Sequence, residues 1–244
     1  MPGEVGLDEF FKRLEARDDL GSAERQALRN SISSFGHFDS QTDMVKEGDR
    51  PKRSTLLLNG FAARYKILAN GERQISAIHV AGDFIDLHSF PLKEMDHSVL
   101  ALTDCEVAFF PHSELEKLTT AYPHLTRMLW LLTLLDSAIH REWITALGRL
   151  SAEARHAHLM CELGIRLEAV GHGTRDKFDL PITQTDLADA MGVSAVHENR
   201  VVQSLRAKGL LIWQGGMVTL PDLEAIYQLA EFDVRYLHLV KEHR

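Results

Sequence analysis

Residues 180–220 carry the feature that most constrains the fold: two short helical patterns, a glycine between them and a short hairpin pattern after them. Thr183 and Ser194 each stand immediately before one of the helical patterns, where a hydroxyl can accept a hydrogen bond from a free helix amide. Gly192 lies between the patterns and can adopt the left-handed conformation that ends a helix. We therefore expect two helices, over residues 184–191 and 195–207.

The hairpin pattern follows the second of these helices directly. Two apolar runs, 210–213 and 217–220, are separated by Gly215-Gly216. A helix, a tight turn, a helix and a hairpin in this order predict a winged helix-turn-helix. Such a motif places the first residues of its second helix in the major groove of DNA, while the first helix crosses the backbone.

Residues 35–111 have a different pattern, in which short apolar or alternating runs are separated by turn signals. Asn70-Gly71 is a strong hairpin signal between two such runs. Many strands at close spacing favour a small antiparallel barrel or jelly roll. The expected strands are Ser54–Leu58, Ala62–Leu68, Gln74–His79, Val99–Leu102 and Glu106–Phe110.

A helix of about 25 residues is expected from Pro123 to the glycine at 148. Its apolar residues recur at coiled-coil spacing and cover much of the circumference, so the helix must be covered on several sides. The partner is either the helix's own domain alone or, in addition, a second copy of the chain. The expected dimer contacts are Leu125, Met128, Leu132, Leu135, Ile139 and Trp143.

The composition is that of an ordinary globular chain, with 45% hydrophobic and 25% charged residues, and its 244 residues fit one large or two modest domains. Two cysteines exclude a disulfide scaffold. The net charge of −8 argues against a general polycation, but a local basic face is enough to bind DNA. No stretch is long enough to span a membrane, and the first residues lack a secretory pattern. These features favour a cytoplasmic protein.

Two parts of the chain together resemble the Crp/Fnr family of bacterial transcription regulators over nearly the full length. The first is the helix-turn-helix ITQTDLADAMGVSAVHENRVVQSLRAKGLL, and the second is the strand-rich region with VAGDF and LALTDCEVAFFP before the long helix. The resemblance implies an α+β fold, with a sensory β-roll and long dimerisation helix in residues 1–150. It places a helical connector and a winged helix-turn-helix in residues 151–244.

The resemblance also implies a function: a homodimer that binds a palindromic DNA operator, contacts RNA polymerase and is not an enzyme. Arg200 matches the family's recognition-helix arginine, which reaches a guanine edge. His197 occupies another base-facing position. The positions that usually hold the phosphate backbone are Thr183, Gln184, Thr185 and Ser194.

Glu198 departs from the family, because a buried aliphatic residue is usual at its position. A lone buried carboxylate is costly, so Glu198 is expected to find a partner such as Arg200, to reach solvent, or to be accompanied by a local rotation of the helix. Glu198→Val is therefore expected to stabilise the domain. Residues 171–244 also carry more acidic than basic side chains. These two features motivate an alternative function, a sensor or interaction protein with weak or lost DNA binding.

The ligand pocket is the second departure. Gly82-Asp83 matches the family's Gly-Glu pair imperfectly, and His97-Ser98 stands where an Arg-Ser pair would hold a cyclic phosphate. On the long helix, His140 and Arg141 match ligand-facing positions. Without a fixed cation beside Asp83 the site is poor for an anion, so cyclic AMP is disfavoured.

The cysteines and histidines of the chain indicate which other sensory cofactors it could bind. The chain has only two cysteines, Cys105 and Cys161, which are too few to ligate an iron–sulfur cluster, so this cofactor is disfavoured. Both cysteines lie in apolar runs, which are typical of buried thiols. A haem needs only one proximal histidine and stays a candidate. A cupin-type metalloenzyme needs a His-x-His pattern on a strand. The only such pattern in the sequence, at residues 156–158, lies on a predicted helix. We therefore expect neither an enzyme nor a metal site. The histidines of the sensory half are His79, His88, His97, His112 and His140.

Overall fold

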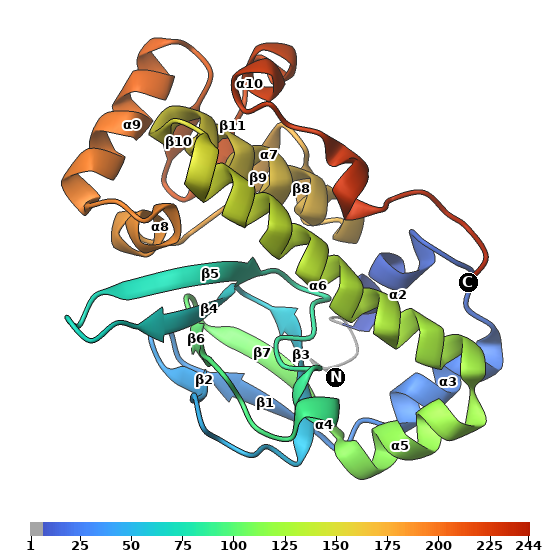
Figure 1. Ribbon diagram of the computed structural model, residues 1–244. Coiled ribbons are helices and arrows are strands. Elements are labelled where there is room, and N and C mark those ends of the chain that lie inside the picture. The colour runs from blue at the N-terminus through green and yellow to red at the C-terminus, as the bar shows by residue number, and fades with distance from the viewer. Residues whose placement is uncertain (1–6) are drawn as a thin grey trace. The chain divides into compact units, whose positions relative to one another are not determined.

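The computed structural model describes residues 7–244, which form two compact units (Figure 1). The first unit holds residues 7–65 together with 78–137 and 238–244. The second holds residues 66–77 and 138–237. The expected division of the chain near residue 150 stays a prediction.

Two antiparallel sheets carry the β-roll that the sequence predicts. One has the strand order β1-β7-β3 and the other β2-β6-β4-β5. All five expected strands are present, and the sequence missed two short ones, β1 and β2, whose residues are mostly exposed or half-buried. The strands are β1 Ser34–Phe38, β2 Asp43–Val45, β3 Arg53–Asn59, β4 Ala62–Ile67, β5 Arg73–His79, β6 Ser98–Ala101 and β7 Cys105–Pro111.

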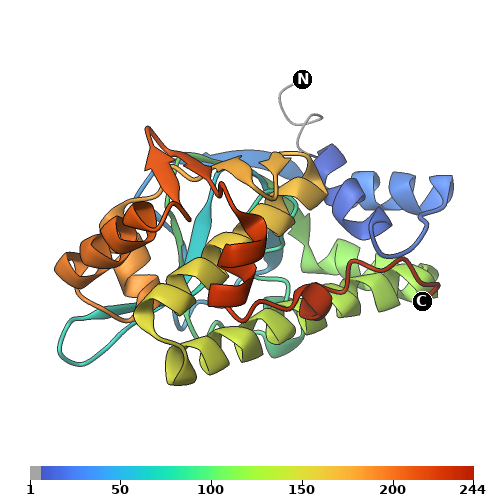
Figure 2. The same ribbon diagram turned by 90° about the horizontal axis from the view of Figure 1, so that it is seen from above.

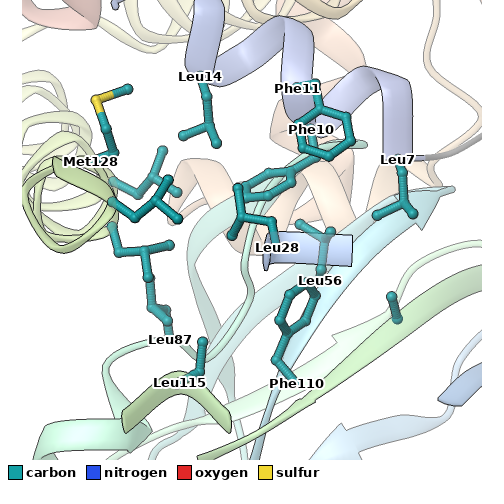
Figure 3. Packing of buried hydrophobic residues seen from close by; sticks show 14 of the residues in the cluster. Leu7, Phe10, Phe11, Leu14, Leu28, Leu56, Leu87, Phe110, Leu115 and Met128 are labelled. Carbon is teal, nitrogen blue, oxygen red and sulfur yellow. The ribbon is translucent and has the colours of Figure 1, made fainter. Parts of the chain in front are cut away.

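Helices close one side of the first unit around an apolar cluster. Phe10 and Leu14 of the N-terminal helix meet Phe110 of β7 and Met128 of the long helix (Figure 3). Each of these four side chains is fully buried. Burying an aromatic or leucine side chain contributes about 1.5–3 kcal/mol, so this cluster holds the N-terminal helices against the sheet. The short helices are α2 Leu7–Glu15, α3 Ser22–Asn30, α4 Ser89–Leu92 and α5 His112–Ala121.

The second unit is built around α7 (Ala152–Val170), a helix that is buried over most of its length. Its sheet has four strands in the order β10-β11-β9-β8, where the sequence predicted only the last hairpin. The extra pair of strands, β8 and β9, precedes α8 in the sequence. The remaining elements are β8 Gly173–Thr174, β9 Lys177–Asp179, α8 Gln184–Met191, α9 Ala195–Ala207, β10 Ile212–Gln214, β11 Met217–Thr219, α10 Leu223–Leu229 and the 3-10 helix Val234–Leu237.

The long helix α6 runs unbroken over Pro123–Arg149 (Figure 2) and carries a buried apolar stripe and an exposed stripe that is partly apolar. The six residues expected to contact a second subunit are all buried within the single chain, at 0–6% exposure. They pack in the chain's own cores because this stripe is the face that α6 turns inward. A second stripe at the same alternating spacing of three and four is exposed: Arg127, Trp130, Leu134, Ser137, Arg141, Ile144 and Gly148.

No helix among residues 7–244 is long and apolar enough to cross a membrane.

Candidate nucleic-acid interface and ligand site

The two helices of the helix-turn-helix begin and end as the sequence predicts. The Thr183 hydroxyl accepts a hydrogen bond from the Asp186 amide at 3.0 Å, and the Ser194 hydroxyl accepts one from the His197 amide at 3.2 Å. Gly192 ends α8 with a φ of 64°, in the left-handed region that favours glycine. The caps and the turn together fix the direction in which α9 starts.

The outer face of α9 is polar and accessible. Its inner face buries Val201, Val202 and Leu205, which leaves Arg200 and its neighbours pointing to solvent. The Asn199 amide, which the sequence argument did not single out, donates to the Gln184 side-chain oxygen at 3.1 Å and links the two helices. All six expected DNA contacts are exposed in the second unit: Thr183, Gln184, Thr185, Ser194, His197 and Arg200.

Glu198 is fully buried, and its partner is a residue that the sequence argument did not name. The Oε1 atom of Glu198 lies 2.5 Å from Nδ1 of His156 on α7, and neither side chain is exposed. The expectation that Glu198 finds a partner is thus confirmed, but the partner is His156 and not Arg200, and the expected route to solvent is wrong. Because the carboxylate is paired, the reason for expecting Glu198→Val to stabilise the domain is removed as well.

The tip of the β4–β5 hairpin, residues 66–77, belongs to the second unit and holds α8 in place. The Arg73 guanidinium lies 2.5 Å from an Asp186 carboxylate oxygen and 2.7 Å from one of Asp189. The Gln74 amide donates to the Asp189 carbonyl at 2.9 Å. The first helix of the helix-turn-helix is thus fixed at its side by charge-assisted hydrogen bonds as well as by its cap.

The Gly82-Asp83 turn of the expected ligand pocket is covered by α2. Asp83 is buried and forms an ion pair with Arg13 of α2 at 2.7 Å. A Cβ atom at Gly82 would lie 3.2 Å from the Glu9 carbonyl oxygen, so the helix approaches the turn closely. The carboxylate that would face a ribose in a cyclic-nucleotide site is instead held by the chain's own N-terminal helix.

An arginine does lie near this region, although the sequence comparison placed none there. Arg64 of β4 is buried and pairs with the Asp136 carboxylate at 2.9 Å. It is close enough to His88 and His97 to lower the pKa of both. Its strand is far from Asp83 and His97 in the sequence, and no local motif marks it as part of the site.

Three histidines near Arg64 are neutral. Burial is the largest cause and Arg64 adds to it, which lowers the pKa of His88 to about 4 and that of His97 to about 3. Burial also lowers the pKa of His79. The Nε2 atoms of all three rings are buried and have no hydrogen-bond partner within residues 7–244. Unused imidazole nitrogens of this kind are available to a ligand.

The other residues expected in the ligand pocket do not come together to form an anion site. The Ser98 hydroxyl accepts a hydrogen bond from the Glu47 amide at 3.0 Å, so it already has a role in the fold. His140 is half-buried and Arg141 is exposed, and both belong to the second compact unit. In the structure, His97 and Ser98 lie near Arg64, a cation that is already paired with Asp136.

A cyclic nucleotide does not fit the residues present. Its phosphate would require an unpaired cation, and Arg13 and Arg64 are each paired with a buried or half-buried carboxylate. A cysteine-ligated cluster does not fit either, because both cysteines are buried apart as free thiols. Burial raises the pKa of Cys105 to about 11 and raises that of Cys161 further, which leaves both thiols protonated.

Two family profiles match the chain. A Crp-like helix-turn-helix domain matches residues 154–229, and a cyclic nucleotide-binding domain matches residues 36–122. The second match agrees with the β-roll fold, although the phosphate-binding residues differ as described above.

Whole proteins of similar sequence and fold agree with these profiles. A "Probable transcriptional activator" of Rhizobium leguminosarum bv. viciae is 26% identical over 88% of this chain and 86% of its own. The "Fumarate and nitrate reduction regulatory protein" of Escherichia coli K12 is 25% identical over 86% of this chain and 84% of its own. FixK2 from Bradyrhizobium japonicum shares the fold with a TM-score of 0.73 at 24% identity, covering 80% of this chain and 96% of that one.

The capped helix-turn-helix, the β-roll and these likenesses agree over most of the chain. The protein belongs to the Crp/Fnr family of transcription regulators, and it is a DNA-binding regulator rather than an enzyme.

Proposed function

We propose that the protein binds a palindromic operator as a homodimer and reads it with Arg200 and His197. Ser194 and the start of α8, with Thr183, Gln184 and Thr185, contact the phosphate backbone. The observation that carries this proposal is the exposed outer face of α9 on a helix-turn-helix that is capped at both helix starts. Arg200 makes no ion pair within residues 7–244, so its guanidinium is available for a guanine edge.

Selection of bound DNA from a random pool by the purified protein tests this proposal. The expected product is a palindrome with half-site centres about 34 Å apart, one helical turn, because two recognition helices on a two-fold axis enter successive major grooves. Recovery of DNA with no common sequence, or of a single unrepeated half-site, would contradict it.

Binding is expected to depend only weakly on salt for a dimeric DNA-binding protein. Of the cations on or just after α9, Arg206 donates to the Trp213 carbonyl and Lys208 pairs with Glu153. Few positive charges then remain to neutralise phosphates, and the salt dependence of the affinity scales with that number.

The alternative function, a sensor with weak or lost DNA binding, loses its main support. Of the two features that motivate it, the acidic balance of residues 171–244 remains, but Glu198 lies in a buried contact with His156 and not on the exposed face of α9. Contact with RNA polymerase and a cytoplasmic location remain part of our proposal and rest on the family alone.

For the dimer contact we propose the exposed stripe of α6. Trp130, Leu134 and Ile144 are 64%, 50% and 69% exposed, although large apolar side chains at helical spacing are normally covered. At about 100° per residue the three lie within about 40° of one direction around the helix. Two such stripes can pack as a coiled coil about a two-fold axis.

Leu134→Glu is expected to convert the dimer into monomers, because it would place two like charges in an apolar contact. Light scattering coupled to gel filtration measures this directly. Leu68→Glu is the matched control, since Leu68 on the β4–β5 hairpin is 54% exposed and receives the same change. A dimer that persists in the α6 variant, or dissociates equally in both, would show that another surface forms the contact.

A further inference from the structure

Two histidines and an aspartate in the first unit lie close enough to share one ion. His88 precedes α4, Asp96 lies in the loop after that helix, and His97 directly precedes β6. One potential ligand atom from each of the three lies within 4.8 Å of the other two. Ligands at about 2.1 Å from one metal ion are at most about 4.2 Å apart, so a small side-chain rotation suffices to bring them to a common centre.

The cluster contains buried imidazole nitrogens, a type of atom that binds transition metals. His97 is 8% exposed, and its Nδ1 lies 2.6 Å from the Asp96 carboxylate. The rings of His88 and His97 are 4.8 Å apart between centroids, and their Nε2 atoms are buried with no hydrogen-bond partner in the described part of the chain.

The local charge also favours a cation over an anion. Asp83 is paired with Arg13, and Asp136 is paired with Arg64. Asp96 is then the carboxylate that remains beside His88 and His97.

We propose that His88, His97 and Asp96 bind a divalent transition-metal ion. Imidazole and carboxylate ligands suit Zn²⁺, Fe²⁺, Co²⁺ or Ni²⁺, whereas Mg²⁺ and Ca²⁺ prefer oxygen ligands alone. The ion would close the loop between α4 and β6 on itself. His79 lies near enough to His88 to affect its pKa, and it borders the site. This proposal is independent of DNA binding and can fail without affecting it.

No local sequence motif marks these residues as a metal site. His88 and His97 are separated by an irregular loop, and their spacing matches no metal-binding motif. The two histidines come together only because α4 and the start of β6 fold back on each other.

Titration of the chelator-treated full-length protein with Co²⁺, followed by its visible absorption, tests the proposal, and calorimetry with Zn²⁺ measures the affinity. We expect one ion per chain. His88→Asn and His97→Asn are each expected to weaken binding by at least about 100-fold, since the loss of an outer-shell partner alone costs about 10- to 100-fold. Asp96 has a 74% exposed side chain, so Asp96→Asn should fold normally and weaken binding by at least about 10-fold.

The matched control is His37→Asn. His37, Asp39 and Asp104 form the other group within residues 7–244 that could hold an ion, and all three are exposed. This variant is expected to bind like the unmodified protein. Loss of binding in His37→Asn with retention in His97→Asn would overturn the proposal, as would the absence of binding at 0.1 mM metal, an affinity of roughly −5.5 kcal/mol. A Soret band that disappears in His97→Asn would identify haem instead and would also overturn it.

Discussion

Replacing Arg200 with alanine is expected to abolish selective binding to the operator while leaving the fold intact. Arg200 is exposed on α9 and forms no ion pair among the described residues, so its loss leaves no buried group without a partner. A bidentate arginine–guanine contact discriminates by about 1–3 kcal/mol. Two copies in a dimer give about 2–6 kcal/mol, which corresponds to a loss of about 30-fold to about 10⁴-fold in specific affinity. Fluorescence anisotropy with the selected operator and a scrambled duplex, at one salt concentration, measures the loss.

The control for this experiment is Arg235→Ala, which removes the same charge from the same compact unit. Arg235 has an 88% exposed side chain and pairs with the neighbouring Asp233 on the surface. Its variant should keep the ratio of operator to scrambled affinity. If Arg200→Ala keeps that ratio too, Arg200 binds phosphate or nothing, and another residue of α9 reads the bases.

The helix-turn-helix could be predicted from the sequence because its determinants are local. Thr183 and Ser194 stand at cap positions, and Gly192 stands where a left-handed turn is required, all within a dozen residues. Each of these signals depends on its own backbone neighbours and not on tertiary packing. The structure confirms both caps and the turn.

The small strands and the inner face of α6 could not be predicted in the same way. β1 reads Ser-Phe-Gly-His-Phe and buries none of its residues fully, so it shows no clear alternation of polar and apolar residues. On α6, two stripes share the alternating spacing of three and four, and periodicity alone does not say which one the chain covers itself. The choice is made by α2 and the sheets, which lie far away in the sequence.

The expected ligand pocket could be predicted from the sequence even less completely than α6. Gly82, Asp83 and His97 could be predicted from the sequence, because they occupy positions of a known motif. Arg64, Asp136 and the pairing of Asp83 with Arg13 could not, because each comes from a separate element. Pairing decides the charge of the site, and pairing is a tertiary property.

Glu198→Val is expected to destabilise the second unit by about 1–3 kcal/mol, because it leaves the buried Nδ1 atom of His156 without its hydrogen-bond partner. Both side chains are fully buried, so solvent does not replace the lost contact. Urea unfolding followed by circular dichroism measures the change. Glu198→Gln is the matched variant, since its amide oxygen can still accept a hydrogen bond from His156 Nδ1, and it should lose much less.

The paired variant His156→Leu with Glu198→Val separates the cost of an orphaned group from the value of the contact. Buried ion pairs are often no better than apolar side chains of similar volume, so the double variant should recover most of the loss from Glu198→Val. A recovery to or above the original stability would mean that the pair serves to orient α9 against α7, and not to stabilise the fold. If Glu198→Val alone equals or exceeds the original stability, the 2.5 Å contact contributes nothing to stability, and Glu198 behaves as an unpaired buried carboxylate.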